Sequence, residues 1–277
     1  MLHAVRVSFR VSTVVGLTGD SVHHWLYKYA GILHRDLSPN NIMCRFIEER
    51  NGEGSMERRV YGVLTDYDLS SFTATMNSNY KKTSQQRTGT PPYMALELLK
   101  GTSALHLYRH DLESLFYIML LTAARHTIGT PRRDDNPRVV LRTSWVLPYQ
   151  EWFNEPRYHV LGSLKGSFFS DMHLITLSRA FEDFLPWLKD LQQSFSSGFS
   201  LGVVASNMRK NPILRAAVNS TVAKFDDDTL GGCVTYTTIM ARVPDLTGEL
   251  AGLVIRDPEY SSGPAGELPA DTAELEG

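Results

Sequence analysis

The sequence has only two cysteines, Cys44 and Cys233, which lie far apart and provide neither a disulfide framework nor the ligand spacing of a metal site. A long hydrophobic run is also absent. The longest, residues 115–124, is about half of the roughly 20 residues that a membrane-spanning helix needs. No charge of one sign dominates, because 28 Lys and Arg face 30 Asp and Glu. We therefore expect an intracellular protein, cytoplasmic or nuclear, with no nucleic acid and no membrane as its main partner.

Hydrophobic patterning predicts a mainly helical chain with short β-hairpins, an α+β fold. The most apolar helix is predicted over residues 111–124 and is expected in the core. Residues 171–193 carry leucines and phenylalanines at steps of three and four, which predicts an amphipathic helix that Pro186 breaks or kinks. Shorter helices are expected at 21–30 and 93–99, a hairpin or loop at 45–60, a strand at 60–64, and loops at 69–90 and 129–144.

Composition divides the chain into four parts. In residues 1–20, valines and Phe9 alternate with polar residues, which favours a strand over the amphipathic helix of a transit peptide, so this segment stays uncertain. Residues 21–195 are expected to form the main lobe, and residues 196–256 a C-terminal extension. Residues 257–277 are rich in Ser, Gly, Pro, Ala and acidic residues, which predicts a disordered tail.

One short segment, residues 34–41 with the sequence HRDLSPNN, carries residues that phosphoryl transfer needs. That reaction uses a carboxylate to orient or deprotonate the acceptor hydroxyl, together with hard oxygen ligands for divalent metal ions. Asp36 stands where the base of a protein kinase would be, and Asn41, five residues later, where a metal-binding Asn would be. A β-rich run then ends at Asp66, in the place of the second metal ligand.

Two further segments follow in the order that a kinase requires. Residues 88–97, TGTPPYMALE, correspond to the platform for an acceptor peptide, with Thr90 near the base and Glu97 anchored by an arginine that the sequence does not identify. The alternative interpretation is a proline-containing loop that caps a helix. Asp111, at the start of the apolar helix, either only caps that helix or also holds the backbone of the 34–41 loop.

This set of motifs resembles the fungal-type protein kinase family. HRDLSPNNIM, LTDYDLSS, RTGTPPYMALELL and RHDLESLFYIMLL are similar to the forms found in that family, and the resemblance extends over roughly residues 21–195. It implies a protein-kinase-like C-lobe, ATP and Mg as cofactors, and Ser or Thr of a protein substrate as the acceptor. The implied site residues are catalytic His34, Arg35, Asp36, Ser38 and Thr90, metal-binding and cofactor-binding Asn41 and Asp66, and structural Glu97 and Asp111.

Three positions depart from the usual kinase pattern. Ser38 replaces the lysine two residues after the base, and a hydroxyl supplies no positive charge to the transferring phosphate. Asp68 replaces the glycine that follows the metal-binding Asp and its aromatic neighbour. We interpret it as a solvated turn residue rather than as a further acid near the phosphates. Leu96 replaces a proline beside the anchoring Glu97, with little expected effect.

The largest departure concerns the ATP-binding lobe. Only 33 residues precede His34, they contain no Gly-x-Gly-x-x-Gly, and their one lysine, Lys28, lies in the helix that leads into the 34–41 loop. We therefore expect a truncated N-lobe, in which case the chain is either a fragment of a longer gene product or a kinase-derived remnant. The surface that such a lobe would cover is expected to be apolar and patchy.

Three functions fit these motifs. The first is a Ser/Thr protein kinase that uses ATP-Mg, and the second is a catalytically inactive, kinase-derived binding module. The third, a small-molecule kinase of the aminoglycoside or choline type, is disfavoured because such enzymes need no peptide platform. Arg35 also predicts pairing with a phosphorylated residue of the 69–90 loop, and an unregulated polar loop is the alternative.

Overall fold

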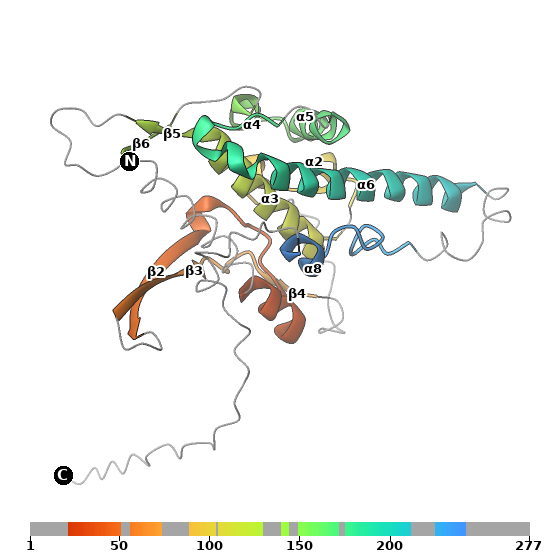
Figure 1. Ribbon diagram of the computed structural model, residues 1–277. Helices are drawn as coiled ribbons and strands as arrows, with labels where there is room; N and C mark the ends of the chain where they lie inside the picture. The colour runs from red at the N-terminus through yellow and green to blue at the C-terminus, as the bar shows by residue number, and fades with distance from the viewer. Residues whose placement is uncertain are drawn as a thin grey trace, which may run out of the picture.

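A computed structural model describes residues 22–50, 56–73, 89–103, 105–129, 140–143, 149–171, 175–211 and 225–241. The described part is mainly helical, with short antiparallel strands that pair two by two, as expected for an α+β fold (Figure 1). No helix within it is long and apolar enough to cross a membrane. The uncertain segment 1–20 and the predicted tail 257–277 lie outside the described residues.

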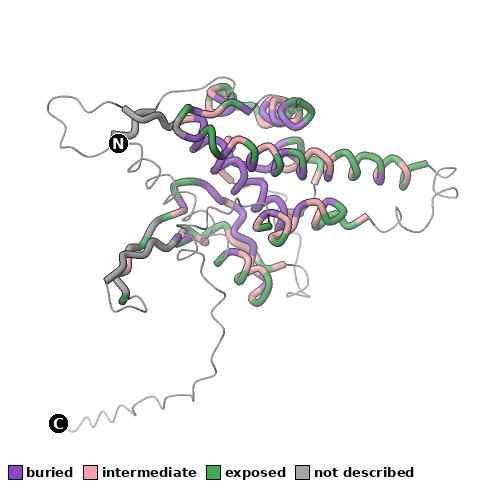
Figure 2. Tube along the Cα trace, in the orientation of Figure 1, coloured by how far each residue is buried: buried purple, intermediate pink, exposed green. Residues whose placement is uncertain are grey.

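Helix α3, Tyr108–Arg125, occupies the centre of the fold. Almost every residue along it is buried, and Figure 2 shows this burial over the length of the helix. It begins three residues before the predicted 111 and ends one residue after the predicted 124. Further helices in the described part of the chain are α2 (Leu96–Lys100), α4 (Gln150–Asn154), α5 (Tyr158–Ser170), α6 (Leu185–Lys210) and α8 (Tyr236–Met240), and residues 22–25 are also helical.

An aromatic cluster joins α3 to α4, α5 and α6. Phe116 of α3 lies 5.5 Å from Phe195 of α6 between ring centroids, and 6.3 Å from Phe168 of α5. Trp152 of α4 meets Phe168 edge to face, at 5.4 Å and 87°. Burial of each such side chain stabilises the fold by roughly 1.5–3 kcal/mol, so this cluster holds the helices that follow α3 against it.

Two strand pairs surround the 34–41 loop. In the larger pair, the strands align antiparallel from Ile42 opposite Leu64 to Arg50 opposite Met56. The segment 45–60 is therefore a hairpin, with longer strands than predicted, and it projects from the helical body in Figure 1. The smaller pair joins Leu33, just before the loop, to Ser71. These strands are β1 (Ile32–Leu33), β2 (Ile42–Arg50), β3 (Met56–Leu64) and β4 (Ser71–Phe72).

Three short helices lie beside these strands and in the 89–97 segment. The π-helix η1, Leu26–Ala30, ends at Gly31, whose left-handed backbone (φ 63°) lets its N–H cap the helix, as the predicted helix leading into this glycine requires. The 3-10 helix η2, Pro39–Asn41, closes the 34–41 loop. The predicted helix 93–99 is divided, because the 3-10 helix η3, Pro91–Tyr93, ends before α2 begins at Leu96.

The predicted loop over residues 129–144 is wrong at both ends. Strand β5, His126–Gly129, continues directly from α3, and it pairs antiparallel with β6, Val140–Thr143. Each strand has only four residues. An alternation of period two over so short a stretch does not stand out from the polar, Pro- and Arg-rich residues between the strands.

The predicted helix over 171–193 is wrong for residues 175–178, which the structure describes and which are not helical. A 3-10 helix, η4 (Arg179–Phe184), precedes α6, which starts at Leu185. Pro186 lies in the first turn of α6, where its missing N–H costs no helical hydrogen bond, so the predicted break is confirmed. Helix α6 then runs on to Lys210, straight through residue 195, where we placed the end of the main lobe.

Residues 225–241 pack back onto the helical body. Leu230, Val234 and Ile239 are buried in the same core as α3 and α6. Helix α8 begins with a capping box, in which the side chains of Thr235 and Thr238 each accept from the backbone N–H of the other. This part of the predicted extension therefore belongs to the folded body.

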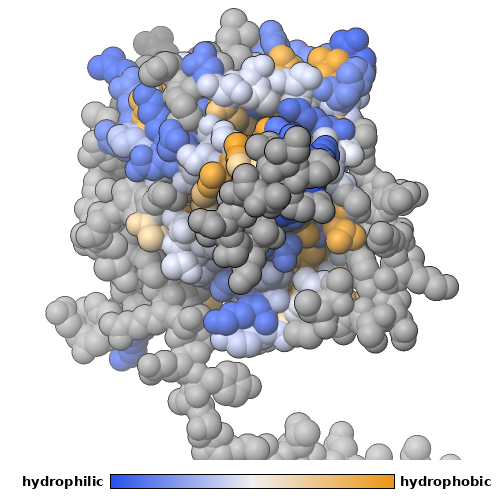
Figure 3. All heavy atoms as spheres, turned by 90° about the vertical axis from the view of Figure 1, so that its right-hand side faces the viewer, coloured by the Kyte–Doolittle hydropathy of each residue, from blue (hydrophilic) through white to orange (hydrophobic). Residues whose placement is uncertain are grey.

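Large apolar side chains are exposed on the elements near the 34–41 loop. They include Trp25, Tyr29, Met43 and Phe72, each about half exposed. On the face in Figure 3, small hydrophobic areas are separated by hydrophilic ones. That a further lobe would cover such apolar surfaces stays a prediction.

Candidate active site

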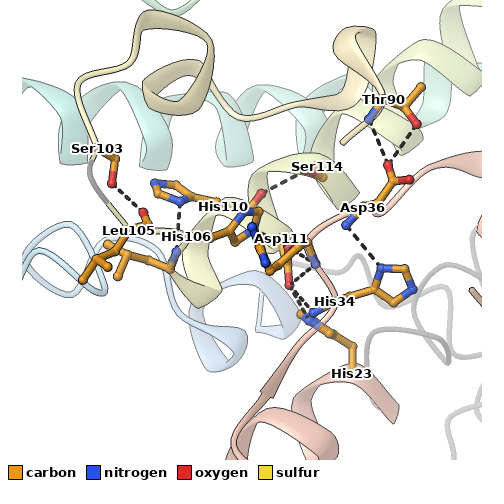
Figure 4. A network of polar contacts seen from close by, with 12 residues as sticks. His23, His34, Asp36, Thr90, Ser103, Leu105, His106, His110, Asp111 and Ser114 are labelled. Atoms are coloured by element: carbon orange, nitrogen blue, oxygen red, sulfur yellow. Dashed lines mark hydrogen bonds and ion pairs between the residues drawn. The ribbon is translucent and has the colours of Figure 1, made fainter. Parts of the chain in front are cut away.

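The carboxylate of Asp111 fixes the 34–41 loop through hydrogen bonds to its backbone. Its Oδ2 accepts from the backbone N–H of His34 at 3.0 Å (Figure 4), and its Oδ1 accepts from the backbone N–H of Arg35 at 3.2 Å. Arg35 has a left-handed backbone (φ 72°), a conformation that costs a non-glycine residue roughly 1–3 kcal/mol. The two hydrogen bonds to one buried carboxylate hold the loop in this strained turn.

Two histidines complete the surroundings of Asp111. His23 Nε2 lies 2.8 Å from Oδ2, and His106 Nε2 lies 2.7 Å from Oδ1. Burial alone would raise the pKa of Asp111, but the two histidines outweigh it and hold that pKa well below its usual range. Because the carboxylate stays ionised, both imidazoles donate to it. The prediction that Asp111 opens the helix is wrong, since α3 begins at Tyr108 and Asp111 faces the loop from inside its first turn.

His34 and Asn41 connect the loop to the end of strand β3. His34 Nε2 donates to the Thr65 carbonyl (2.9 Å), while its Nδ1 accepts from the Asp36 N–H (3.3 Å). Burial lowers the pKa of His34, although the bond to Thr65 opposes this, so the neutral tautomer fits both contacts. The Asn41 carbonyl accepts from the Thr65 N–H (2.9 Å), and the Asn41 amide Nδ2 donates to the Asp36 carbonyl (2.8 Å). These bonds place Asp66, the next residue, at the edge of the loop.

Asp36 is tied to the start of the 89–97 segment. Its Oδ1 accepts from both the N–H and the hydroxyl of Thr90, each at 2.9 Å (Figure 4). Gly89 makes this approach possible, because its φ is 123° and an added Cβ would lie 3.3 Å from the Arg35 carbonyl. Two segments 54 residues apart in sequence thus meet at one half-buried carboxylate.

Glu97 has partners that the sequence did not reveal. Arg109 and His110, both in the first turn of α3, contact its carboxylate. Burial alone would raise the pKa of Glu97, but His110 and Arg109 together lower it to about 2. The sequence predicted an arginine partner for Glu97 but did not identify it. The structure shows that this partner is Arg109, because α2 carries Glu97 next to the start of α3. The RHD sequence, residues 109–111 at the start of the apolar helix, was the available signal.

Arg35 and Ser38 are both buried within the loop. The Arg35 Nε has no hydrogen-bond partner among the described residues. Most of the hydroxyl residues that we considered as phosphorylated partners of Arg35 fall in 74–88, outside the described part of the chain. The regulatory pairing therefore stays a prediction. Asp68 is exposed in a turn, in agreement with its interpretation as a solvated residue.

The residues expected to bind Mg are Asn41 and Asp66. Because Asn41 Nδ2 is bonded to the loop, its amide oxygen is the end left to accept a ligand. Asp66 is exposed and has a left-handed backbone (φ 63°). Hard oxygens of this kind fit Mg, which takes one or two protein ligands together with phosphate and water. No cluster of three or more His, Cys, Asp or Glu side chains suited to a metal occurs among the residues described.

Residues 20–123 match the family model of the fungal protein kinase. The match includes the 34–41 loop, the end of β3, the 89–97 segment and most of α3. The resemblance to the fungal-type protein kinase family is thereby confirmed for these residues, although we had extended it to residue 195. No curated protein matches the chain.

Proposed function

We propose that this chain carries the catalytic half of a protein kinase, which transfers the γ-phosphoryl group of ATP to a Ser or Thr hydroxyl of a protein substrate. The observation that carries this proposal is the geometry around Asp36. Its carboxylate stands on a loop held by Asp111 and is joined to the 89–97 segment through Thr90. The match to the fungal protein kinase family supports the same class of reaction.

In this mechanism Asp36 is the base. Oδ1 is occupied by the two donors of Thr90, so Oδ2 is the oxygen that takes the proton of the acceptor hydroxyl. The acceptor oxygen forms a bond to the γ-phosphorus while the bond to the bridging oxygen breaks, and ADP leaves with that electron pair. The two hydrogen bonds from Thr90 hold the Asp36 carboxylate in its orientation while the acceptor lies along the 89–97 segment.

Asn41 and Asp66 would hold Mg, which neutralises the charge of the phosphates when bound. Ser38 lies beside this site and is buried, but its hydroxyl brings no charge to the phosphate. The protein kinase C-lobe as a fold, the Ser/Thr specificity and the location inside the cell belong to this proposal.

The direct test replaces Asp36 with Asn in the full chain. Asn keeps an oxygen that accepts from Thr90, so the free energy of unfolding should change by less than about 0.5 kcal/mol. Phosphoryl transfer from radiolabelled ATP-Mg to Ser- and Thr-containing peptides should fall by about 10²–10⁴-fold. Asp190→Asn, at an exposed position of α6, is the matched control and should keep its activity. A wild-type chain no faster than Asp36→Asn would rule out the proposed reaction.

A binding module without catalysis is the second candidate, because Trp25, Tyr29 and Phe72 expose large apolar surfaces near the loop. Titration calorimetry separates the two functions. Binding of ATP-Mg that weakens in Asn41→Ala and Asp66→Ala favours the kinase. An intact fold that binds no ATP-Mg favours the module.

A further inference from the structure

The short stretch Met94–Leu96, in the middle of the 89–97 segment, is buried, and its first two residues lie between helices and have no regular structure. Met94 and Ala95 are extended, between the 3-10 helix η3 and helix α2, and the exposed fraction of Ala95 is 0%. Backbone polar groups buried in this way need partners from elsewhere in the molecule. The Met94 carbonyl and the Leu96 N–H, one on each side of Ala95, point to two different helices.

The partners are two buried ionisable side chains. Lys165 of α5 donates from Nζ to the Met94 carbonyl at 2.7 Å, and Glu113 of α3 accepts from the Leu96 N–H through Oε1 at 2.7 Å. The exposed fractions of Lys165 and Glu113 are 0% and 1%. Burial of a lysine and a glutamate costs several kcal/mol for each charge before compensation. Neutral side chains would satisfy the same two backbone groups at lower cost in free energy. The presence of Lys165 and Glu113 therefore requires a reason beyond stability.

Tyr117 connects the two groups into one unit. Its hydroxyl donates to Glu113 Oε1 at 2.6 Å, and Lys165 Nζ lies 3.6 Å from the centroid of its ring. The ring of Trp152 is 5.2 Å from the same ammonium. The aromatic faces compensate part of the lost hydration of Lys165. Because α3 and α5 supply the two side chains, the distance between these helices fixes the spacing of the backbone groups at Ala95.

Hydrogen bonds through Thr90 connect the stretch Met94–Leu96 to Asp36. The Met94 N–H donates to the Thr90 carbonyl (3.1 Å), and Thr90 binds the Asp36 carboxylate. Helix α3 also carries Asp111, which holds the loop on which Asp36 stands. A shift of Met94–Leu96 relative to α3 would therefore move Thr90 relative to Asp36.

We propose that Glu113 and Lys165 are positioning residues, which hold the backbone on both sides of Ala95 and thereby fix the 89–97 segment against Asp36. This inference rests on the proposed function, in which the acceptor lies along this segment. The family match ends at residue 123, so Lys165 comes from a part of the chain that the match does not include.

Amide hydrogen exchange of the full chain without nucleotide tests the positioning directly. In Lys165→Met and in Glu113→Leu, the amides of Thr90 and of Tyr93 to Leu96 should exchange at least about tenfold faster, while those of α3 stay within about twofold. Glu113→Gln keeps an oxygen for Leu96, so its exchange should remain within about threefold of the wild type. Lys189→Met, on α6 away from the segment, is the control. Should Lys165→Met not fold, Lys165→Gln, which retains an N–H donor without the charge, is measured in the same way. Its amides from Thr90 to Leu96 should exchange faster than those of the wild type and more slowly than those of Glu113→Leu.

An unchanged rate at Thr90–Leu96 in a folded Lys165 variant would overturn the inference, and so would acceleration that is uniform over all helices. Kinetics add a second reading. Lys165→Met should raise the KM for an acceptor peptide by about tenfold and leave that for ATP within about twofold. A chain without activity contradicts the proposed function alone, because the exchange measurement needs no ATP.

Discussion

At the scale of single residues, Asp111 contributes most to the candidate site. Both of its oxygens are surrounded by donors: His106 and the Arg35 N–H at Oδ1, and His23 and the His34 N–H at Oδ2. A carboxylate accepts at both oxygens, whereas an amide accepts at only one. The charge is therefore required by the surroundings, even though the exposed fraction of Asp111 is 0%.

We expect Asp111→Asn to lower the free energy of unfolding by about 3–5 kcal/mol, because its NH₂ group must face N–H donors in a buried place. Urea denaturation followed by tryptophan fluorescence measures this change. The exposed Asp190→Asn should stay within about 0.5 kcal/mol of the wild type. A loss below about 1 kcal/mol in Asp111→Asn would mean that the two backbone bonds do not hold the loop.

Glu113 gives the stability of the protein a specific pH dependence. Burial raises its pKa to about 7 from 4.5, although Tyr117, the Leu96 N–H, Lys165 and Arg109 all pull it down. Between these two pH values the folded state keeps a proton that the unfolded state has lost, so this contribution to stability decreases as the pH rises.

Relative to Glu113→Gln, the wild type should therefore lose about 1.4 kcal/mol of unfolding free energy for each pH unit in that window. Above a pH of about 7 the difference should become constant, because both states are then ionised. Parallel urea titrations of the two proteins give this difference directly. A difference that does not change across the window would show that Glu113 titrates normally in the folded state.

The residues proposed for the candidate site could be selected from the sequence, but the side chains that contact them could not. Asp36, Asn41 and Asp66 stand out in the sequence because their spacing follows from a chemical requirement. The arginine that binds Glu97, and the histidines that bind Asp111, depend on how α2, α3, the helical residues 22–25 and the connection 105–107 pack together. One sequence contains no information on which of several Arg and His residues the packing brings close.

At the scale of elements, prediction succeeded where a hydrophobic pattern was long and failed where it was short or interrupted. The apolar run of α3 predicted a helix whose start, residue 111, lies three residues after the observed start at Tyr108. The middle of α6, by contrast, has the sequence SFSSGFSLGVV (residues 194–204), whose Ser and Gly residues disfavour a helix. It is helical because Phe195, Gly198 and Ala205 are buried against neighbouring elements, so tertiary packing outweighs local propensity.

Two glycines of α6 allow this packing to be tested. An added Cβ at Gly198 would lie 2.7 Å from the Cβ of Leu230, whereas at Gly202 the nearest atom, in the ring of Phe225, is 3.5 Å away. We expect Gly198→Ala to lose about 1–3 kcal/mol of unfolding free energy through overpacking. Gly202→Ala should gain about 0.5–1 kcal/mol, because alanine favours the helix.

Thermal and urea denaturation of both variants measure these values. The opposite signs are what the close approach of residues 225–241 to α6 requires. Equal stabilisation in both variants would mean that Leu230 does not lie against Gly198, and that α6 is exposed on this side.

At the scale of the whole molecule, α3 joins parts of the chain that are far apart in sequence. Its first turns hold the 34–41 loop through Asp111 and the 89–97 segment through Glu113. Arg109, in the same region, connects α2 to the segment 225–241, because it binds the Glu97 carboxylate and donates from Nε to the Asp227 carbonyl at 2.6 Å. The folded body therefore extends beyond the residues that match the kinase family.

Replacement of Arg109 by Lys tests this connection. One ammonium cannot reproduce two donors at the separate positions that the guanidinium reaches, so either the Glu97 carboxylate or the Asp227 carbonyl loses its contact with residue 109. We expect a loss of about 1.5–3 kcal/mol in the free energy of unfolding. Amide exchange of residues 225–241 should accelerate by about tenfold, while the exchange of α5 remains close to that of the wild type.

Arg157→Lys is the matched control, because the Arg157 side chain is 64% exposed and its ion pair is with Glu155, only two residues away. Such a surface pair contributes little, so stability and exchange should be nearly unchanged. If Arg109→Lys left the exchange of 225–241 as it is, contacts other than Arg109 would hold that segment, among them the burial of Leu230 and the ion pair of Arg209 with Asp227. Arg109 would then serve Glu97 only, and the C-terminal segment would be held independently of the candidate site.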